Sequence, residues 1–282
     1  MKPFVLFAAL FAFVGCTAER TAPPTDADHA EPRGVESHDH GSSDPHGGHV
    51  MAKAMLMVRT EPKDVEVGVP VTLHMMIHDD SGAMVEEFEV IHEKKIHLIV
   101  VRQGLDEFAH VHPELHEDGS FSIEHTFPEA GKYRLYVDHK PAGQSQATAT
   151  GSVEVAGDVE PAAELVPNAP GRVQGEGLEA DVAVGLAAKG ATTITFQVLH
   201  ESQAVDDLEP YLGAMGHLVV ISADGAEYVH AHPTGESPSA PDGKVSFEAH
   251  FVKPGLYKGW GQFQRGGQVY TIPFVLRVPI DE

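Results

Sequence analysis

The chain has 282 residues, which corresponds to about two domains of ordinary size. Its 42 acidic and 19 basic side chains give a formal net charge of −23, which argues against binding to nucleic acid or to an anionic bilayer surface, since both need a basic face. A single cysteine excludes an intrachain disulfide and a zinc site built on cysteines, whereas 19 histidines is an unusually high number. A surface of this charge favours small cations as partners.

Residues 1–16 have the pattern of a secretory signal. Lys2 precedes an apolar stretch from Phe4 to Val14, which is too short to span a bilayer at ~20 residues. The tetrad that ends this segment, Phe13-Val14-Gly15-Cys16, resembles the lipobox of bacterial lipoproteins, although leucine is usual at the place of Phe13. The resemblance implies that Cys16 is lipidated and anchors the chain in the cell envelope. The alternative is a plain secretory signal with an incidental cysteine.

The residue after the cysteine bears on the location of this anchor. Lipoproteins of Gram-negative cells that carry Asp at this place stay at the inner membrane, but here the residue is Thr17. The resemblance therefore favours the periplasmic face of the outer membrane. The lipid anchor is the only contact with a membrane that the sequence predicts.

Residues 17–50 predict a disordered tether, because small and polar residues dominate and large apolar side chains are nearly absent. Several imidazoles on a flexible chain can converge on one metal ion. Four histidines near the end of the tether are candidates for such binding: His38, His40, His46 and His49. The alternative is a solvated spacer whose histidines are incidental.

Beyond the tether, the chain contains two copies of one unit. Residues 97–113 read HLIVVRQGLDEFAHVHP and residues 217–233 read HLVVISADGAEYVHAHP, a repeat of about 120 residues. The proline-containing stretch 158–171 lies between the copies. We therefore expect one domain at residues 52–157 and a second at residues 160–282.

Alternation of apolar and polar positions predicts antiparallel strands in both copies. In the first copy, turn residues separate seven expected strands: 53–59, 69–78, 96–102, 107–112, 120–127, 132–138 and 146–155. Seven short strands in about 105 residues are typical of an immunoglobulin-like β-sandwich. Two triplets, Gly131-Lys132-Tyr133 and Gly255-Leu256-Tyr257, are similar to the tyrosine corner of such domains. The predicted fold class is therefore all-β, with two tandem immunoglobulin-like antiparallel sandwiches.

The pattern G-x-P-V-x-L-x-x-x-I-x-D at residues 68–79 resembles YtkA-like and FixH-type extracytoplasmic domains. The H-L-x-V-V, H-x-H-P and F-x-x-x-G-x-Y elements that follow resemble tandem domains of envelope proteins associated with copper and heavy metals. The resemblance covers residues 52–282. It implies immunoglobulin-like domains and a role in handling metal ions in the envelope.

Histidines on neighbouring strands indicate a metal site in the first copy. His110 and His112 lie two residues apart on one strand and so share a face. A hairpin turn at Gln103-Gly104 would set His97 opposite His110, and a turn at Gly104-Leu105 would set it opposite His112. Either turn places all three side chains on one face. A further ligand is expected among the residues that follow: His116 or Asp118.

The second copy offers an equivalent set of side chains. A turn at Asp224-Gly225 sets His217 opposite His232, with His230 on the same face. Met215 lies two residues before His217, so parity places its thioether on that face as well. Three imidazoles suit Cu²⁺ or Zn²⁺, and a thioether would favour Cu⁺.

Two other functions remain open on the sequence alone. Histidines at strand ends can simply form hydrogen bonds, in which case the protein is a structural or adhesive envelope lipoprotein without metal. Gly104, His110, His112 and Glu117 match much of the first motif of the cupin metalloenzymes, but the second cupin motif is absent. We therefore expect a binding protein rather than an enzyme. Its predicted task is to buffer or deliver copper, or alternatively zinc, beside a metal efflux or delivery system.

We expect the change Cys16→Ser to abolish anchoring, because Cys16 is the only thiol of the chain and ends the apolar segment. In the source cell the variant should remain an uncleaved or soluble precursor. Membrane fractionation and the length of the processed chain measure this outcome. Unchanged fractionation together with unchanged processing would contradict the lipobox interpretation.

Overall fold

A computed structural model describes residues 54–186, 191–233 and 240–279. The predicted signal and tether lie outside these ranges, and so do Cys16 and the four histidines from His38 to His49. Both predicted domains belong to one compact unit, Asp44–Glu282. Within the described ranges we find no helix with the length and apolar character needed to cross a membrane.

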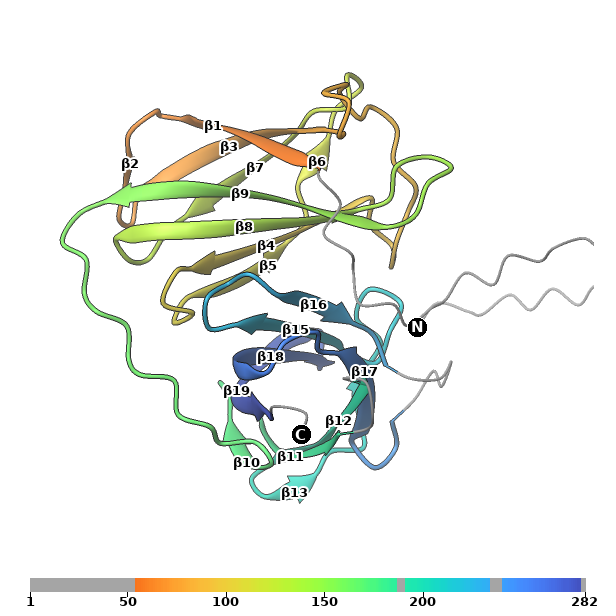
Figure 1. The fold of residues 1–282 in the computed structure, drawn as a ribbon. Coiled ribbons are helices and arrows are strands. Elements are labelled where there is room, and N and C mark those ends of the chain that lie inside the picture. Colours follow the sequence, from red (N-terminus) through yellow and green to blue (C-terminus); the bar gives the residue numbers. More distant parts are fainter. Residues whose placement is uncertain (1–53, 187–190, 234–239, 280–282) are drawn as a thin grey trace, which may run out of the picture. The chain divides into compact units, whose positions relative to one another are not determined.

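The first domain contains nine strands that pair in the order β5-β4-β8-β9-β1-β3-β7-β6, with β2 on β9. Figure 1 shows β1, β3 and β7 in one layer and β9, β8 and β4 in the other. The strands are β1 (Met55–Glu61), β2 (Val65–Glu66), β3 (Pro70–His78), β4 (Ile96–Arg102), β5 (Phe108–Val111), β6 (Glu114–Leu115), β7 (Phe121–Thr126), β8 (Gly131–His139) and β9 (Ala147–Ala156). The seven predicted strands each match one of these to within two residues at either end.

The described residues of the second domain form ten strands in two sheets. One sheet has the order β10-β11-β12-β13 with β17 on β12, and the other has the order β14-β18-β15-β16 with β19 on β18. The strands are β10 (Gly171–Gln174), β11 (Glu179–Leu186), β12 (Ala191–His200), β13 (Gln203–Ala204), β14 (Leu208–Glu209), β15 (His217–Ser222), β16 (Tyr228–Ala231), β17 (Lys244–His250), β18 (Gly255–Arg265) and β19 (Gln268–Val278). The predicted all-β fold of two repeated immunoglobulin-like domains is confirmed.

Each domain contains the hydrogen bond of a tyrosine corner. The hydroxyl of Tyr133 donates to the carbonyl oxygen of Glu129 at 3.0 Å, and that of Tyr257 donates to the carbonyl oxygen of Lys253 at 2.8 Å. Burial raises the pKa of both phenols to about 12, so they remain donors at neutral pH. The two triplets singled out in the sequence therefore perform equivalent tasks at the start of β8 and β18.

Strands β4 and β15 are buried along their whole length. Leu98 of β4 points into the core of the first domain, whereas its neighbour Ile99 packs against Val219 and Ile221 of β15. An antiparallel sheet commonly leaves one face to water, and its strands then alternate between apolar and polar residues. The unbroken runs HLIVV and HLVVI depart from that pattern because the other domain covers the second face.

Two stacked ring pairs mark the contact between the domains. Tyr136 of β8 stacks on Tyr228 of β16 with ring centres 4.7 Å apart, and Phe108 of β5 stacks on Trp260 of β18 at 4.6 Å. Tyr136 lies opposite Ile99 in its sheet, and Trp260 has the equivalent place in β18. The duplicated domains therefore present the same face to each other, as the two halves of a symmetric dimer do.

We expect Phe108→Ala to loosen this interface, because the change removes the ring that covers Trp260. Trp260 is the only tryptophan of the chain and is 2 % exposed, so its fluorescence should shift to longer wavelength. The free energy of unfolding should fall by about 1–3 kcal/mol, less than for a fully buried phenylalanine, because Phe108 is half-buried.

The matched control is Phe88→Ala, which removes a ring from the core of the first domain. This control should lower stability but leave the emission of the folded protein unchanged. An unshifted emission in Phe108→Ala would contradict the domain interface described above.

Candidate metal centre

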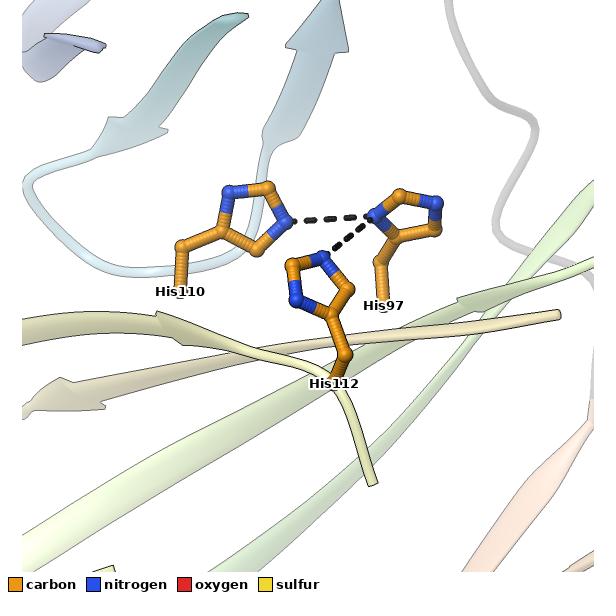
Figure 2. Close-up of side chains that lie close together, drawn as sticks. All are labelled: His97, His110 and His112. Carbon is orange, nitrogen blue, oxygen red and sulfur yellow. Dashed lines mark hydrogen bonds between the residues drawn. The ribbon is translucent and has the colours of Figure 1, made fainter. Parts of the chain in front are cut away.

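The hairpin of β4 and β5 brings together the three histidines predicted for the first domain. Its register sets His97 opposite His112, with His110 beside them, as expected for a turn at Gly104-Leu105. Figure 2 shows the rings turned toward one another: Nδ1 of His97 lies 3.2 Å from Nε2 of His110 and 3.2 Å from Nε2 of His112. The three side chains share one face as predicted, while their role as ligands stays a prediction.

The hairpin of β15 and β16 repeats this arrangement in the second domain. Its register sets His217 opposite His232, as predicted, and Nδ1 of His217 lies 3.4 Å from Nε2 of His230. In each triad the three ring nitrogens that could bind an ion lie within 4.8 Å of one another. We call the two sets the first triad (His97, His110, His112) and the second triad (His217, His230, His232).

The spacing of these nitrogens fits a bound ion. Nitrogen ligands at ~2.0 Å from one metal, at trigonal or tetrahedral angles, lie ~3.3–3.5 Å apart. The outer nitrogen of His97 donates to the carbonyl oxygen of Ile91 at 2.8 Å, and that of His217 donates to the carbonyl oxygen of Tyr211 at 2.9 Å. Because a carbonyl can only accept, the proton of each neutral ring is on the outer nitrogen and the lone pair points into the triad.

The second triad contains an unsatisfied atom as well. Among the described residues, Nε2 of His232 is a buried side-chain nitrogen with no hydrogen-bond partner. Buried polar atoms without a partner are rare because they cost free energy, and a bound ion is one accepted explanation for them. A metal ion bound to Nε2 of His232 would supply the partner that this nitrogen lacks among the described residues.

Each domain provides the hydrogen-bond acceptor that orients one candidate ligand of the other domain. Nδ1 of His110 donates to Oε1 of Gln262, which belongs to the second domain, at 2.7 Å. Nδ1 of His230 donates to Oδ2 of Asp138, which belongs to the first domain, also at 2.7 Å. In the strand register, Asp138 of β8 lies opposite His97 of β4. Gln262 of β18 lies opposite His217 of β15, which is the equivalent position in the second domain. Such acceptors fix the orientation of a metal-binding imidazole and raise its basicity.

Burial lowers the pKa of the clustered imidazoles. The pKa of His110 falls to about 4 and that of His112 to about 3, with neighbouring imidazoles adding to the effect of burial. The pKa values of three further rings are lowered for the same main reason: His97, His217 and His232. These rings are therefore neutral at pH 7, the form that binds a metal ion.

A seventh imidazole, which the sequence analysis missed, lies against the second triad. The ring of His92 stacks on His232 with centres 3.4 Å apart and planes 20° apart. His92 sits in the tight turn Ile91–Lys94, where it has a positive φ of 47°, and burial lowers its pKa to about 4. The equivalent turn of the second domain carries Leu212, so comparison of the repeats gave no signal for His92.

Three residues expected as further ligands lie elsewhere in the structure. Met215 is 6 % exposed in the apolar core of the second domain, because β15 begins only at His217 and the strand parity does not extend back to Met215. His116 lies near the surface after β6, where its Nε2 is 2.8 Å from the hydroxyl of Ser122. Asp118 caps a turn by accepting from Ser120. Neither His116 nor Asp118 belongs to the first triad as the structure describes it.

The fold and this site define a protein of two immunoglobulin-like domains whose histidine triads meet where the domains touch. The chain belongs to the family described as "Domain of unknown function (DUF8832)", whose model matches residues 52–157 and 172–279. This family differs from the YtkA-like and FixH-type groups that the sequence resembles. A relationship to those groups therefore stays a prediction. No curated protein matches the chain.

Solved structures with related strand arrangements share little sequence with the chain. A bacterial ice-binding adhesin is 10 % identical over 83 % of this chain and 66 % of its own, with a TM-score of 0.26. FdeC, an adhesin of Escherichia coli, is 16 % identical over 84 % and 66 %, with a TM-score of 0.24. Two fibronectin type-III domains of chicken tenascin are 12 % identical over 79 % and 97 %, with a TM-score of 0.24. The chain thus spans about two thirds of both adhesin structures, and at these TM-scores the likenesses carry no argument about function.

We expect the metal-free protein to lose stability on acidification. The pKa of His110 is about 4 in the folded chain and ~6.5 once the chain unfolds, so the unfolded state binds more protons below pH ~6.5. Stability should therefore be full above pH ~6.5 and fall as the pH drops toward 4, by up to about 3 kcal/mol for this one ring. Urea unfolding in the presence of a chelator measures the loss.

The variant His110→Gln should flatten this dependence, because it removes one of the rings that must be neutral in the folded state. His200→Gln, at an exposed position, is the matched control and should keep the slope of the unmodified protein. An identical slope in His110→Gln and in the unmodified protein would contradict the depressed pKa of His110.

Proposed function

We propose that this protein binds transition-metal ions at its two histidine triads, with copper as the first candidate and zinc as the alternative. The observation that carries the proposal is the geometry of each triad: ring nitrogens converge at 3.2–3.4 Å. In two rings of each triad the outer nitrogen donates to a fixed acceptor, which leaves the inner lone pair facing the other rings. Converging lone pairs repel one another unless a cation lies between them. The unpartnered nitrogen of His232 supports the same conclusion.

The donor set favours copper and zinc among the available metals. Three imidazoles are borderline ligands that suit Cu²⁺ and Zn²⁺, and affinity for divalent ions is highest for Cu²⁺ in the usual order. Since Met215 lies in the core, the second triad is a nitrogen site, and the sequence-based argument for Cu⁺ from a thioether is weakened. We propose one ion for each triad.

We propose buffering or delivery of the ion in the cell envelope rather than catalysis. The apolar leader and Cys16 support an extracytoplasmic, lipid-anchored location, and the histidines from His38 to His49 would add weak binding near the membrane. The missing second cupin motif supports a binding role over an enzymatic one. A metal efflux or delivery system is the partner that such a role requires.

A structural or adhesive envelope protein without metal is the second candidate. The apolar contact between the two domains, which includes Ile99, Val219 and Ile221, would hold them together without any metal ion. In this case the triads would serve only as hydrogen-bonded contacts between the domains. Metal content separates the two candidates directly.

We expect residues 51–282, which keep both domains and lack the tether, to bind about two copper ions per chain at micromolar concentration. The double change His230→Ala with His232→Ala should remove one ion, because the second triad then keeps one of its three imidazole ligands. Calorimetry and metal analysis after gel filtration measure both values.

The matched control is His116→Ala with His200→Ala, which removes two exposed histidines outside the triads. This variant should still bind two ions. A chain that binds neither copper nor zinc stoichiometrically would overturn the proposed function and favour the structural candidate, with any metal binding left to the tether.

A further inference from the structure

We infer that the two triads form one paired metal centre with unequal halves, in which Asp138 makes the second triad the stronger site. This inference rests on the proposed function, and it adds an order of filling and a role for a carboxylate. The chain offers its own comparison, because the duplicated domains place an amide, Gln262, where the other half has Asp138.

The triads are as close to each other as their own members are. The ring of His110 lies 5.2 Å from that of His230 and 5.8 Å from that of His217, and His97 lies 5.7 Å from His230. Within the first triad the ring centres are 4.9–5.5 Å apart.

This closeness limits how far apart two bound ions can be. A metal ~2.0 Å from a ring nitrogen lies about 3 Å from the ring centre, so ions bound to His110 and His230 are at most about 12 Å apart. Two cations at this distance inside a protein repel each other, so binding of the first ion weakens binding of the second.

The two halves differ in the group that accepts the outer proton of a ligand. His230 donates to the carboxylate of Asp138, whereas His110 donates to the neutral amide of Gln262. A carboxylate makes the imidazole a better donor to a metal and also brings a negative charge close to the ion. An amide supplies the same geometry without the charge. The second triad is therefore the tighter of the two.

Asp138 lies buried among three donors, one of which is His230 of the second triad. Its side chain is fully buried, at 0 % exposure, and it accepts from the hydroxyls of Thr148 and Tyr228 at 2.6 Å each. These donors are neutral, and the ion-pair partner that the described residues offer is His230. A buried charge is normally paired or bound to a metal. An ion on His230 would place a positive charge next to the side chain of Asp138, acting through the ring.

His92 adds to the difference between the halves. It stacks on His232 of the second triad and lies 6.1 Å from His217, and the equivalent turn in the second domain carries Leu212. The second triad therefore has an additional imidazole beside it and the carboxylate of Asp138 behind it, both contributed by the first domain.

We expect the protein to hold one ion tightly and to exchange the other. The second triad fills first and holds its ion, and the first triad fills later because it lacks the carboxylate and faces a cation. A weakly held second ion beside a tightly held one suits a protein that passes metal to a partner. We expect the two affinities to differ by 10–100-fold, the usual effect of such an outer acceptor.

The test is a copper titration of the mature chain by calorimetry with a competing chelator, in the unmodified protein and two isosteric variants. Asp138→Asn should weaken the tight site 10–100-fold, so that the two sites become similar. Gln262→Glu should strengthen the weak site, because it places a carboxylate behind the first triad. Since this variant keeps Asp138, the test remains valid where Asp138→Asn fails to fold. Gln268→Glu adds the same charge at an exposed position and should change neither affinity.

Electron paramagnetic resonance of the Cu²⁺ form tests the pairing independently. We expect a resolved spectrum with one ion per chain and dipolar broadening with two. Two equal affinities in the unmodified protein, no effect of Gln262→Glu, or no broadening would overturn the inference while leaving the proposed function in place. Absence of stoichiometric metal would overturn the proposed function together with the inference.

Discussion

The hydrogen bond from His230 to Asp138 joins the two domains at the place where the candidate ligands meet. It requires that the outer face of one sheet lie directly on that of the other, and the stacked rings of Phe108 and Trp260 show such contact. An apolar interface of this kind is stabilised by burial rather than by the histidines, so the triads have a framework in which to form. The site is therefore a property of the domain pair, because each domain orients a ligand of the other.

Duplication of one domain explains why the two halves of the site have the same geometry. The residues that differ between the copies explain why the halves differ in charge. Equivalent strands place Asp138 and Gln262 at matching positions, and equivalent turns place His92 and Leu212. The geometry of the two halves is therefore alike while their charge is not. An equal pair of metal sites would fill with similar affinity, whereas a carboxylate behind one of them gives the centre a preferred order.

Local pattern predicted the strands and both triads, because facing parity and hairpin register depend only on nearby residues. The same reasoning misplaced Met215, since the strand begins after it, and His116, since that loop turns away. Local pattern could not predict the roles of Asp138 and His92, because each of these side chains contacts a histidine of the other domain. The unbroken apolar runs of β4 and β15 did carry a signal for that interface, as a strand buried on both faces needs a second covering layer.

X-ray absorption at the copper edge of the loaded mature chain tests whether the histidines bind the ion, because it reports the atoms around the ion. We expect about three nitrogen ligands at ~2.0 Å, together with the outer-shell scattering typical of imidazole rings. A shell of oxygen ligands without imidazole scattering would contradict this expectation, since copper would then be bound by surface carboxylates and not by the histidines between the two domains.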